Sequence, residues 1–196
     1  MPHGKYIEIF FNTIDESSNL SELVRKDILK FLKFMPVKKG KIILMEGSPC
    51  NQLYFLCKGL FRSFYHGNEG EDITSAFSFE NEFFTNVKGF VNQINSNETI
   101  QAIEPSYICA IDRNDYFNII YKYPYLMGIS HHTINKHRVE LEDRIRVLQH
   151  GNASDKLAFF NQYYPGLQNR VPKKFIATFL GMRYETMHRN SKKIAL

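Results

Sequence analysis

Residues 41–111 consist of short runs of β-branched and aromatic residues that are separated by turn residues. Glycine-containing turns such as Gly47-Ser48-Pro49 and Gly67-Asn68-Glu69-Gly70 divide the runs. Many short strands at this spacing favour a sandwich or a barrel. The predicted strands are Lys41–Met45, Leu53–Cys57, Leu60–Tyr65, Ile73–Phe79, Thr99–Ile103 and Tyr107–Ile111.

Helical periodicity flanks this β-rich region on both sides. Apolar residues at helical spacing predict a helix over Asn19–Phe34, which Pro36 would end. A short helix is expected from Asp112, as its N-cap, to about Tyr121. Gly151-Asn152 interrupts the later helical region and is interpreted as a hinge. The other predicted helices are Pro124–Gln149, Ala153–Tyr164, Pro172–Leu180 and a last one from Arg183 or Tyr184 to Ile194.

The longest of these helices carries an apolar residue at every seventh position, a spacing typical of a coiled-coil seam. The stripe consists of Met127, Ile134, Leu141 and Leu148. Its companion positions are mixed, with Ser130, His137 and Arg144 on one side and His131, Arg138 and Ile145 on the other. One alternative is a single helix that packs its stripe on its own domain. We favour a homodimer, because so long a helix in a small chain needs a cover for its stripe.

Charge is distributed unevenly along the chain. The net charge is +5, but the segment from Gly151 to the end holds eight Lys and Arg against two acidic residues. That segment therefore carries +6 and the first 150 residues sum to −1. A nearly neutral body followed by a strongly basic segment is typical of a polyanion-binding module. A solvated basic face without a partner is the alternative.

The three cysteines, Cys50, Cys57 and Cys109, are odd in number and widely spaced. They form neither a disulfide framework nor a metal-binding pair, so we expect buried thiols in a reducing cytoplasm. No apolar run approaches the roughly 20 residues that cross a bilayer, and the first residues lack the pattern of a signal peptide. We therefore expect a cytoplasmic protein without a membrane partner.

The sequence shows no arrangement that supports catalysis. His131-His132 and His137 are close in sequence, but no carboxylate or thiol completes a convincing set of metal ligands. A nucleophile signature such as G-x-S-x-G is not found. We expect no enzyme activity, no cofactor and no metal.

The stretch Val171–Lys193 has the pattern of a helix-turn-helix. Ala177 lies four residues before Gly181, where a small residue lets the second helix cross the first closely. Gly181 would take the positive φ of the tight turn. The apolar residues Ile176, Phe179, Leu180, Met182 and Met187 would form the small core.

This arrangement turns a polar face of the last helix outward, where it fits a major groove. Arginine can bind guanine bidentately and glutamate can accept a hydrogen bond from cytosine, whereas flanking lysines suit phosphates. The predicted DNA-binding residues are Arg170, Lys173, Lys174, Tyr184, Glu185, Thr186, His188, Arg189 and Lys192.

The whole chain resembles the cyclic-AMP receptor protein and fumarate-nitrate regulator (Crp/Fnr) family of transcription regulators. Phe175–Gly181 with Tyr184–Arg189 is similar to the family's recognition segment, in which a Glu and an Arg four residues later read bases. Glu185 and Arg189 match these two positions, whereas Tyr184 stands where the best-known members often have Arg. Gly40–Gly47 and Leu53–Arg62 are similar to the family's cyclic-nucleotide-type roll.

The resemblance implies an α+β fold with an N-terminal double-stranded β-helix, a jelly roll like that of cyclic nucleotide-binding proteins. The implied domains are a sensor roll at residues 1–122, a dimerisation helix at 123–150 and a winged-helix-like helix-turn-helix at 151–196. The state of the sensor would reach the DNA-binding heads through the long helix and the hinge at Gly151.

Phe79–Phe84 and Ser96–Ala102 match the flanks of the family's phosphate-binding cassette, which implies an effector pocket at Glu82, Phe83, Asn97 and Thr99. Asn97 stands where cyclic nucleotide binders have Arg. A cyclic phosphate without a bidentate cation loses its main charge-assisted hydrogen bonds. We therefore expect an unidentified small-molecule effector other than cyclic AMP. The clustered cysteines of the iron–sulfur branch are also missing.

Our first hypothesis is a homodimeric, sequence-specific regulator whose partners are double-stranded DNA, a second copy of the chain, RNA polymerase and the unidentified effector. The alternative is an effector-binding or scaffold protein with a basic protein-interaction tail and no specific DNA readout. The two hypotheses differ at Glu185 and Arg189, which a DNA reader leaves exposed and an interaction hairpin partly buries.

Overall fold

The computed structural model describes the backbone of residues 2–18 and 20–194, and the side chains of residues 4–14 and 20–189. The chain divides into two compact units. The first unit comprises Met1–Ser63 and Phe77–Thr133, and the second unit comprises Phe64–Ala76 and Ile134–Leu196. Strands β4 and β5 and helix α5 each contribute residues to both units.

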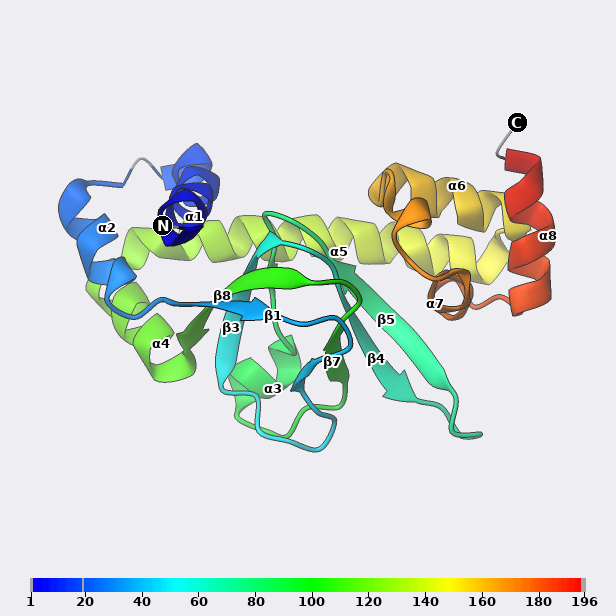
Figure 1. Ribbon diagram of the computed structural model, residues 1–196, viewed down its shortest axis with the longest axis horizontal. Coiled ribbons are helices and arrows are strands. Elements are labelled where there is room, and N and C mark those ends of the chain that lie inside the picture. Colours follow the sequence, from blue (N-terminus) through cyan, green and yellow to red (C-terminus); the bar gives the residue numbers. More distant parts are fainter. Residues whose placement is uncertain (1, 19, 195–196) are drawn as a thin grey trace. The chain divides into compact units, whose positions relative to one another are not determined.

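Two four-stranded sheets form the β-rich region (Figure 1). The first has the order β1 (Lys33–Val37), β8 (Ser106–Asp112), β3 (Gln52–Lys58) and β6 (Phe83–Phe84). The second has the order β2 (Ile42–Leu44), β7 (Thr99–Ala102), β4 (Phe61–His66) and β5 (Asp72–Ser78). All six predicted strands are confirmed, and β1 and β6 are additional.

A buried apolar cluster draws side chains from both sheets. Leu56 of β3 and Ile108 of β8 come from the first sheet, and Phe61 of β4 and Ile100 of β7 come from the second. All four side chains are almost completely removed from water, and burial of apolar area is the main favourable term in folding. The predicted sandwich or barrel is therefore confirmed as a two-sheet roll.

The predicted helix over Asn19–Phe34 is wrong in its C-terminal part. Helix α2 spans Glu22–Leu29, after the N-cap Ser21, and β1 already begins at Lys33. Phe34 pairs with Cys109 of β8, so tertiary pairing overrides the helical pattern of its apolar neighbours. Pro36 lies within β1, where it is tolerated because β1 is an edge strand. Asn19 lies outside the described residues.

Helix α1 (Pro2–Ser18) was not predicted, and it adds aromatic side chains to a second apolar cluster. Phe10 meets the rings of Phe55 and Phe83 edge-on, with centroids 5.2 and 5.9 Å apart. Tyr6 stacks on Tyr107 at 4.0 Å. These contacts pack α1 against strands β3, β6 and β8.

The remaining helices follow the predictions within a few residues, apart from α3, which was not predicted. They are α3 (Val87–Asn92), α4 (Arg113–Lys122), α5 (Met127–His150), α6 (Ala153–Tyr163), α7 (Lys173–Phe179) and α8 (Tyr184–Ile194), with short 3-10 turns at Pro124–Leu126 and Leu167–Asn169. Asp112 precedes α4 as predicted, but its carboxylate binds Lys33 and Gln52 and makes no capping bond. Among described residues 127–194 no strand is found.

The three cysteines are buried and unbridged, as predicted. Burial raises the pKa of the Cys57 thiol to about 12 and raises the pKa of Cys109 as well, because an apolar environment disfavours the thiolate. These thiols are therefore inert packing groups at neutral pH.

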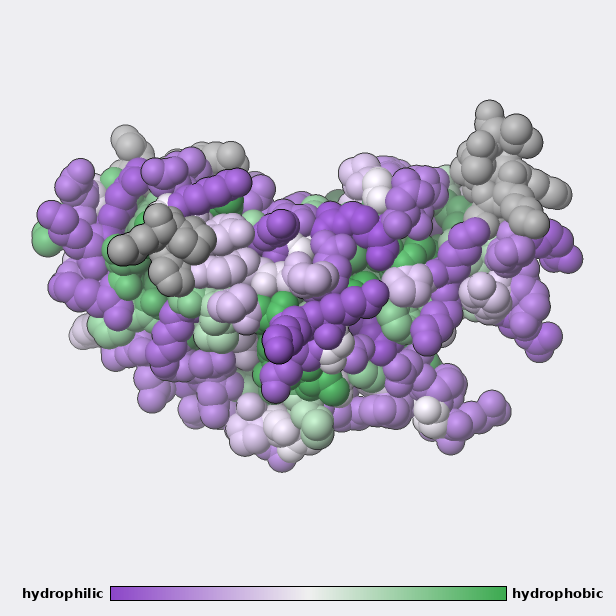
Figure 2. All heavy atoms as spheres, in the orientation of Figure 1, coloured by the Kyte–Doolittle hydropathy of each residue, from purple (hydrophilic) through white to green (hydrophobic). Residues whose placement is uncertain are grey.

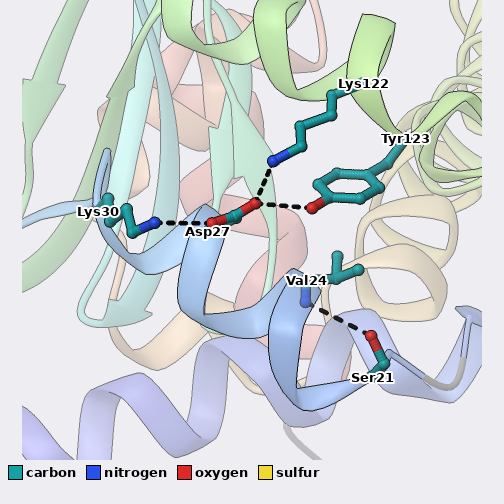
Figure 3. Close-up of polar contacts among 6 residues, drawn as sticks. All are labelled: Ser21, Val24, Asp27, Lys30, Lys122 and Tyr123. Carbon is teal, nitrogen blue, oxygen red and sulfur yellow. Dashed lines mark hydrogen bonds and ion pairs between the residues drawn. The ribbon is translucent and has the colours of Figure 1, made fainter.

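One carboxylate ties α2 to the end of α4 (Figure 3). Asp27 accepts hydrogen bonds from Lys122, from Lys30 at 2.8 Å and from the Tyr123 hydroxyl at 2.7 Å. Lys122 contributes most to holding the pKa of Asp27 well below its ordinary value, followed by Lys30 and Tyr123.

We predict that Asp27→Asn lowers the stability of the chain at pH 7 and removes part of its acid sensitivity. The folded-state pKa is depressed, so this stabilisation is complete above the unfolded-state pKa of about 4 and is lost as pH falls toward the folded-state value. Urea unfolding at pH 7 and pH 3 should show a gap between wild type and variant that narrows at pH 3.

The matched control is Glu22→Gln on the same helix, where the carboxylate is 90% exposed and 3.9 Å from Lys26. This substitution should change little at either pH, because exposed pairs contribute little. An equal effect of both substitutions would contradict the role given to Asp27.

Candidate nucleic-acid interface

Helices α7 and α8 are joined by a tight turn that depends on Gly181. Gly181 has a φ of +56°, in the left-handed region that glycine adopts without strain. The N–H of Met182 donates to the carbonyl of Ala177 at 2.9 Å, and the Gly181 N–H donates to the carbonyl of Thr178 at 3.2 Å. Ala177 is buried. The turn conformation predicted for this helix-turn-helix is confirmed.

An apolar core fixes the two helices to α6. Ile176, Phe179, Leu180 and Met187 are buried, whereas Met182 is only half-buried. The ring of Phe179 meets Phe160 of α6 and Tyr164, the residue that follows α6, with centroids 6.0 and 5.5 Å apart. Because Met187 points into this core, the opposite side of α8 faces solvent.

The exposed side of α8 carries the residues predicted to contact bases. Tyr184, Glu185, His188 and Arg189 are exposed, and Thr186 is half-buried. Glu185 and Arg189 are four residues apart and share one helical face. Figure 2 shows a hydrophilic surface over the described part of α8. Lys192 lies in α8, but the structure describes only its backbone and not its side chain.

The residues predicted to contact phosphates surround the start of α7. Lys173 and Lys174 form its first turn after Pro172 and are exposed, and Arg170 is half-buried just before them. The Lys174 ammonium lies 5.1 Å from the centre of the Phe175 ring. The helix-turn-helix thus presents exposed cations at the start of α7 as well as the exposed face of α8.

Helix α5 buries none of its 24 residues within the chain. The predicted stripe is accessible, with Ile134 and Leu141 more than half exposed and Met127 and Leu148 each 36% exposed. The middle of the stripe, Ile134 and Leu141, is left largely uncovered by the chain itself, and such an exposed apolar surface is typical of an oligomer contact.

The structure distinguishes the two companion sets of this stripe. Ser130 bonds to the Tyr116 hydroxyl of α4 at 2.7 Å, and Arg144 donates to the backbone carbonyls of Ser75 and Phe179, whereas His137 is exposed and lies 3.7 Å from Glu140 of its own helix. The other set, His131, Arg138 and Ile145, is exposed. The accessible seam is therefore the stripe together with this second set.

Helix α6 is held firmly against α5 where the hinge was predicted. The hydroxyls of Tyr163 and Tyr164 donate to Asp143 and Glu140, and the hydrogen bond to Asp143 raises the pKa of Tyr163 to about 12. A Cβ on Gly151 would lie 2.5 Å from the carbonyl oxygen of Val147, so only glycine fits the break. Asn152 and Asp155 then form a capping box for α6.

The predicted effector residues each contact neighbours within the roll. Phe83 is packed against Phe10 and Phe55, and Glu82 accepts from the backbone N–H of Phe79 at 3.3 Å. Thr99 accepts from the backbone N–H of Glu46 at 3.0 Å. A surface depression of about 450 Å³ contains none of the four and is lined by Gly40–Met45, Ser48 and Pro49.

Asn97 is instead bound by a residue that the sequence did not single out. Asn86 is buried, and its amide donates to Asn97 at 2.9 Å and to Glu98 at 3.2 Å. Its carbonyl oxygen caps α3 through the N–H of Gly89 at 2.8 Å. An Asn just before a short apolar run is an N-cap signal that could have identified this position.

Among the described residues, no group of three or more His, Cys, Asp and Glu side chains is placed to hold a metal ion. No helix in the described part of the chain combines the length and the apolar character that a membrane span requires.

Known proteins share this fold. Residues 34–123 match the family model of the cyclic nucleotide-binding domain. FixK2 from Bradyrhizobium japonicum superimposes with a TM-score of 0.73 at 16% identity, over 84% of each chain. A candidate transcriptional regulator of the crp/fnr family from Eubacterium rectale gives 0.71 at 19% identity, over 90% of this chain and 84% of that one.

A third structure is the c-di-GMP responsive global regulator CLP of Xanthomonas campestris, with a TM-score of 0.69 at 12% identity, over 89% of this chain and 92% of that one. None of the curated proteins compared with the chain matches it. Residues 34–123 thus match the cyclic nucleotide-binding domain, and most of the chain has the fold of the Crp/Fnr regulators that its sequence resembles.

Proposed function

We propose that this chain is a homodimeric, sequence-specific DNA-binding transcription regulator of the Crp/Fnr type. The observation that carries the proposal is the exposure of Glu185 and Arg189 on one face of α8, together with the exposure of Lys173 and Lys174 in the first turn of α7. Two structural neighbours, one described as a crp/fnr-family regulator and one as a global regulator, support the same role.

The proposed contacts follow from the chemistry of the exposed side chains. Helix α8 enters the major groove, where the Arg189 guanidinium donates to guanine and the Glu185 carboxylate accepts from cytosine. Lys173, Lys174 and Arg170 bind phosphates, which orient the module and supply affinity that depends on salt. Lys192, on the same helix, is proposed as a further contact.

The exposed face also argues against the alternative function. A protein-interaction hairpin would bury part of the Glu185 and Arg189 face, and both residues are exposed in the chain. The proposal contains no catalytic step, cofactor or metal. It places the protein with the DNA in the cytoplasm, with RNA polymerase as a further partner.

Dimerisation is proposed through the exposed stripe of α5. Two copies of Met127, Ile134, Leu141 and Leu148 would cover one another in a parallel seam about a two-fold axis. His131, Arg138 and Ile145 complete the seam, because Ser130 and Arg144 of the other set already bond to other elements of their own chain. The two helix-turn-helix heads would then be related by the same axis.

Leu141→Asp should convert the dimer to a monomer, because it places two carboxylates opposite each other in an apolar seam. Sedimentation velocity at micromolar concentration measures the change. Val139→Asp is the matched control, since Val139 lies on the same helix off the stripe and is 51% exposed against 52% for Leu141. A monomeric wild type, or equal effects of the two substitutions, would refute the seam.

The proposed effector is a small molecule other than cyclic AMP, sensed by the roll. Asn97 is neutral and is held by Asn86, so the position offers no guanidinium to a cyclic phosphate. Calorimetry with cyclic AMP and cyclic GMP should show no binding at micromolar concentrations, and Asn97→Arg should increase the affinity for either. Micromolar binding by the wild type would overturn this assignment.

Base contacts and phosphate contacts should respond differently to substitution on the preferred duplex. Arg189→Ala should reduce the binding free energy for this duplex by about 1–3 kcal/mol and relax the base preference at one position of the site. Lys173→Ala should weaken binding to specific and non-specific duplexes alike. It should also reduce the slope of log affinity against log salt concentration by about one unit. Fluorescence anisotropy at several salt concentrations measures both.

The control for the loss of one positive charge is Lys39→Ala, which removes an exposed cation between β1 and β2, outside the helix-turn-helix. This substitution should leave the affinity for the duplex and its dependence on salt nearly unchanged. If Arg189→Ala and Lys173→Ala behave alike, α8 does not read bases directly.

A further inference from the structure

One guanidinium in the second unit joins three segments that are distant in sequence. Nη1 of Arg144, on α5, donates to the carbonyl oxygen of Ser75 on β5 at 2.6 Å. Nη2 of the same side chain donates to the carbonyl oxygen of Phe179 on α7 at 2.7 Å. The guanidinium also lies over the Phe179 ring, 3.7 Å from its centre.

Only arginine can make this set of contacts. Its planar guanidinium carries five N–H donors in a fixed fork, so one side chain satisfies two carbonyls on different segments and stacks on an aromatic ring. Lysine would keep the charge, but its ammonium is a compact group without the fork. Position 144 therefore requires the planar shape of arginine as well as its positive charge.

A second, neutral contact joins the same strand to the same helix. The backbone N–H of Thr74, on β5, donates to the hydroxyl of Thr178 on α7 at 3.2 Å, and the two threonine hydroxyls are 3.2 Å apart. Thr74 is completely buried. Strand β5 is thus fixed to α7 at two successive residues, 74 and 75.

These contacts lead directly to the recognition helix. Phe179 is the last residue of α7, and Gly181, two residues later, makes the tight turn into α8. At the other end, β5 continues at Phe77 into the first unit, which holds most of the region that matches the cyclic nucleotide-binding domain. A movement of β5 would therefore act on α7 through Arg144 and Thr178.

We propose that Arg144 is a positioning residue that sets the orientation of the recognition helix α8 and couples it to β5 of the roll. This inference rests on the proposed DNA-binding function. It adds a second connection to the covalent one at Gly151, because α7 is held by α5 and β5 together. The effector signal then reaches the DNA-binding head through β5 as well as along the dimerisation helix.

The first test is hydrogen exchange, which needs no DNA. Arg144→Met keeps a long side chain but removes every donor, and Arg144→Lys keeps the charge. Both should increase amide exchange in β5 and in α7 together, by roughly tenfold for Arg144→Met, because bonds to charged groups are among the stronger ones. The control Arg146→Met removes a guanidinium that is 77% exposed and 3.5 Å from Asp143, and should change neither segment.

The second test measures the orientation of the heads. Duplexes carrying the preferred half-sites are prepared with spacers that differ by single base pairs. The wild type should prefer one spacing, whereas Arg144→Met should bind several spacings with similar affinity and keep the base preference within each half-site. A merely structural arginine would lower stability and leave the spacing preference unchanged, and that result would overturn the proposal.

The outcomes separate this proposal from the proposed function. If the wild type selects no DNA but Arg144→Met loosens β5 and α7 together, the DNA-binding function fails and the coupling to β5 stands. If exchange in these segments does not change, the coupling itself fails. Should Arg144→Met not fold, Thr178→Val decides, because it removes the neutral contact to β5 and one bond within α7 but leaves Arg144 in place. It should loosen the same two segments to a smaller degree.

Discussion

The exposed apolar stripe of α5 is the constraint on which the other parts depend. A helix of 24 residues with no fully buried residue and an exposed apolar stripe needs a cover, and burial of apolar area is the force available to provide one. Ser130 and Arg144 of one companion set bond to other elements of the chain, and the other set remains exposed. In the proposed dimer, the same helix would offer one side to a second copy and use the other side to hold the helix-turn-helix.

In the last three helices, apolar residues form a core and polar residues form the candidate interface. Apolar residues of α6, α7 and the inner side of α8 form a core around Phe179, and the positive φ of Gly181 sets the angle between α7 and α8. The outer side of α8 keeps an acid and a cation that can make directional hydrogen bonds, and lysines at the start of α7 supply charge. In the proposed complex, specificity and affinity would therefore come from different residues.

Local sequence signals predicted much of this structure. The alternation of apolar runs with turns predicted six strands, and Ala177 with Gly181 predicted the turn between the last two helices. Local signals gave the wrong element where contacts between residues far apart in sequence determine the structure. Residues 31–34 have helical spacing, but pairing with β8 draws Phe34 into a strand, and α1 is fixed by rings on β3, β6 and β8. The contacts of Arg144 had no sequence signal, because Ser75 and Phe179 contribute only backbone carbonyls.

The central claim is that a symmetric dimer of this chain reads DNA with α8. The most direct measurement is the selection of bound duplexes from a random pool by the wild-type protein, followed by sequencing. The account predicts an enriched two-fold-symmetric sequence whose half-sites are about one helical turn apart, roughly 34 Å. A pool that shows no enriched sequence, or one without two-fold symmetry, would contradict it.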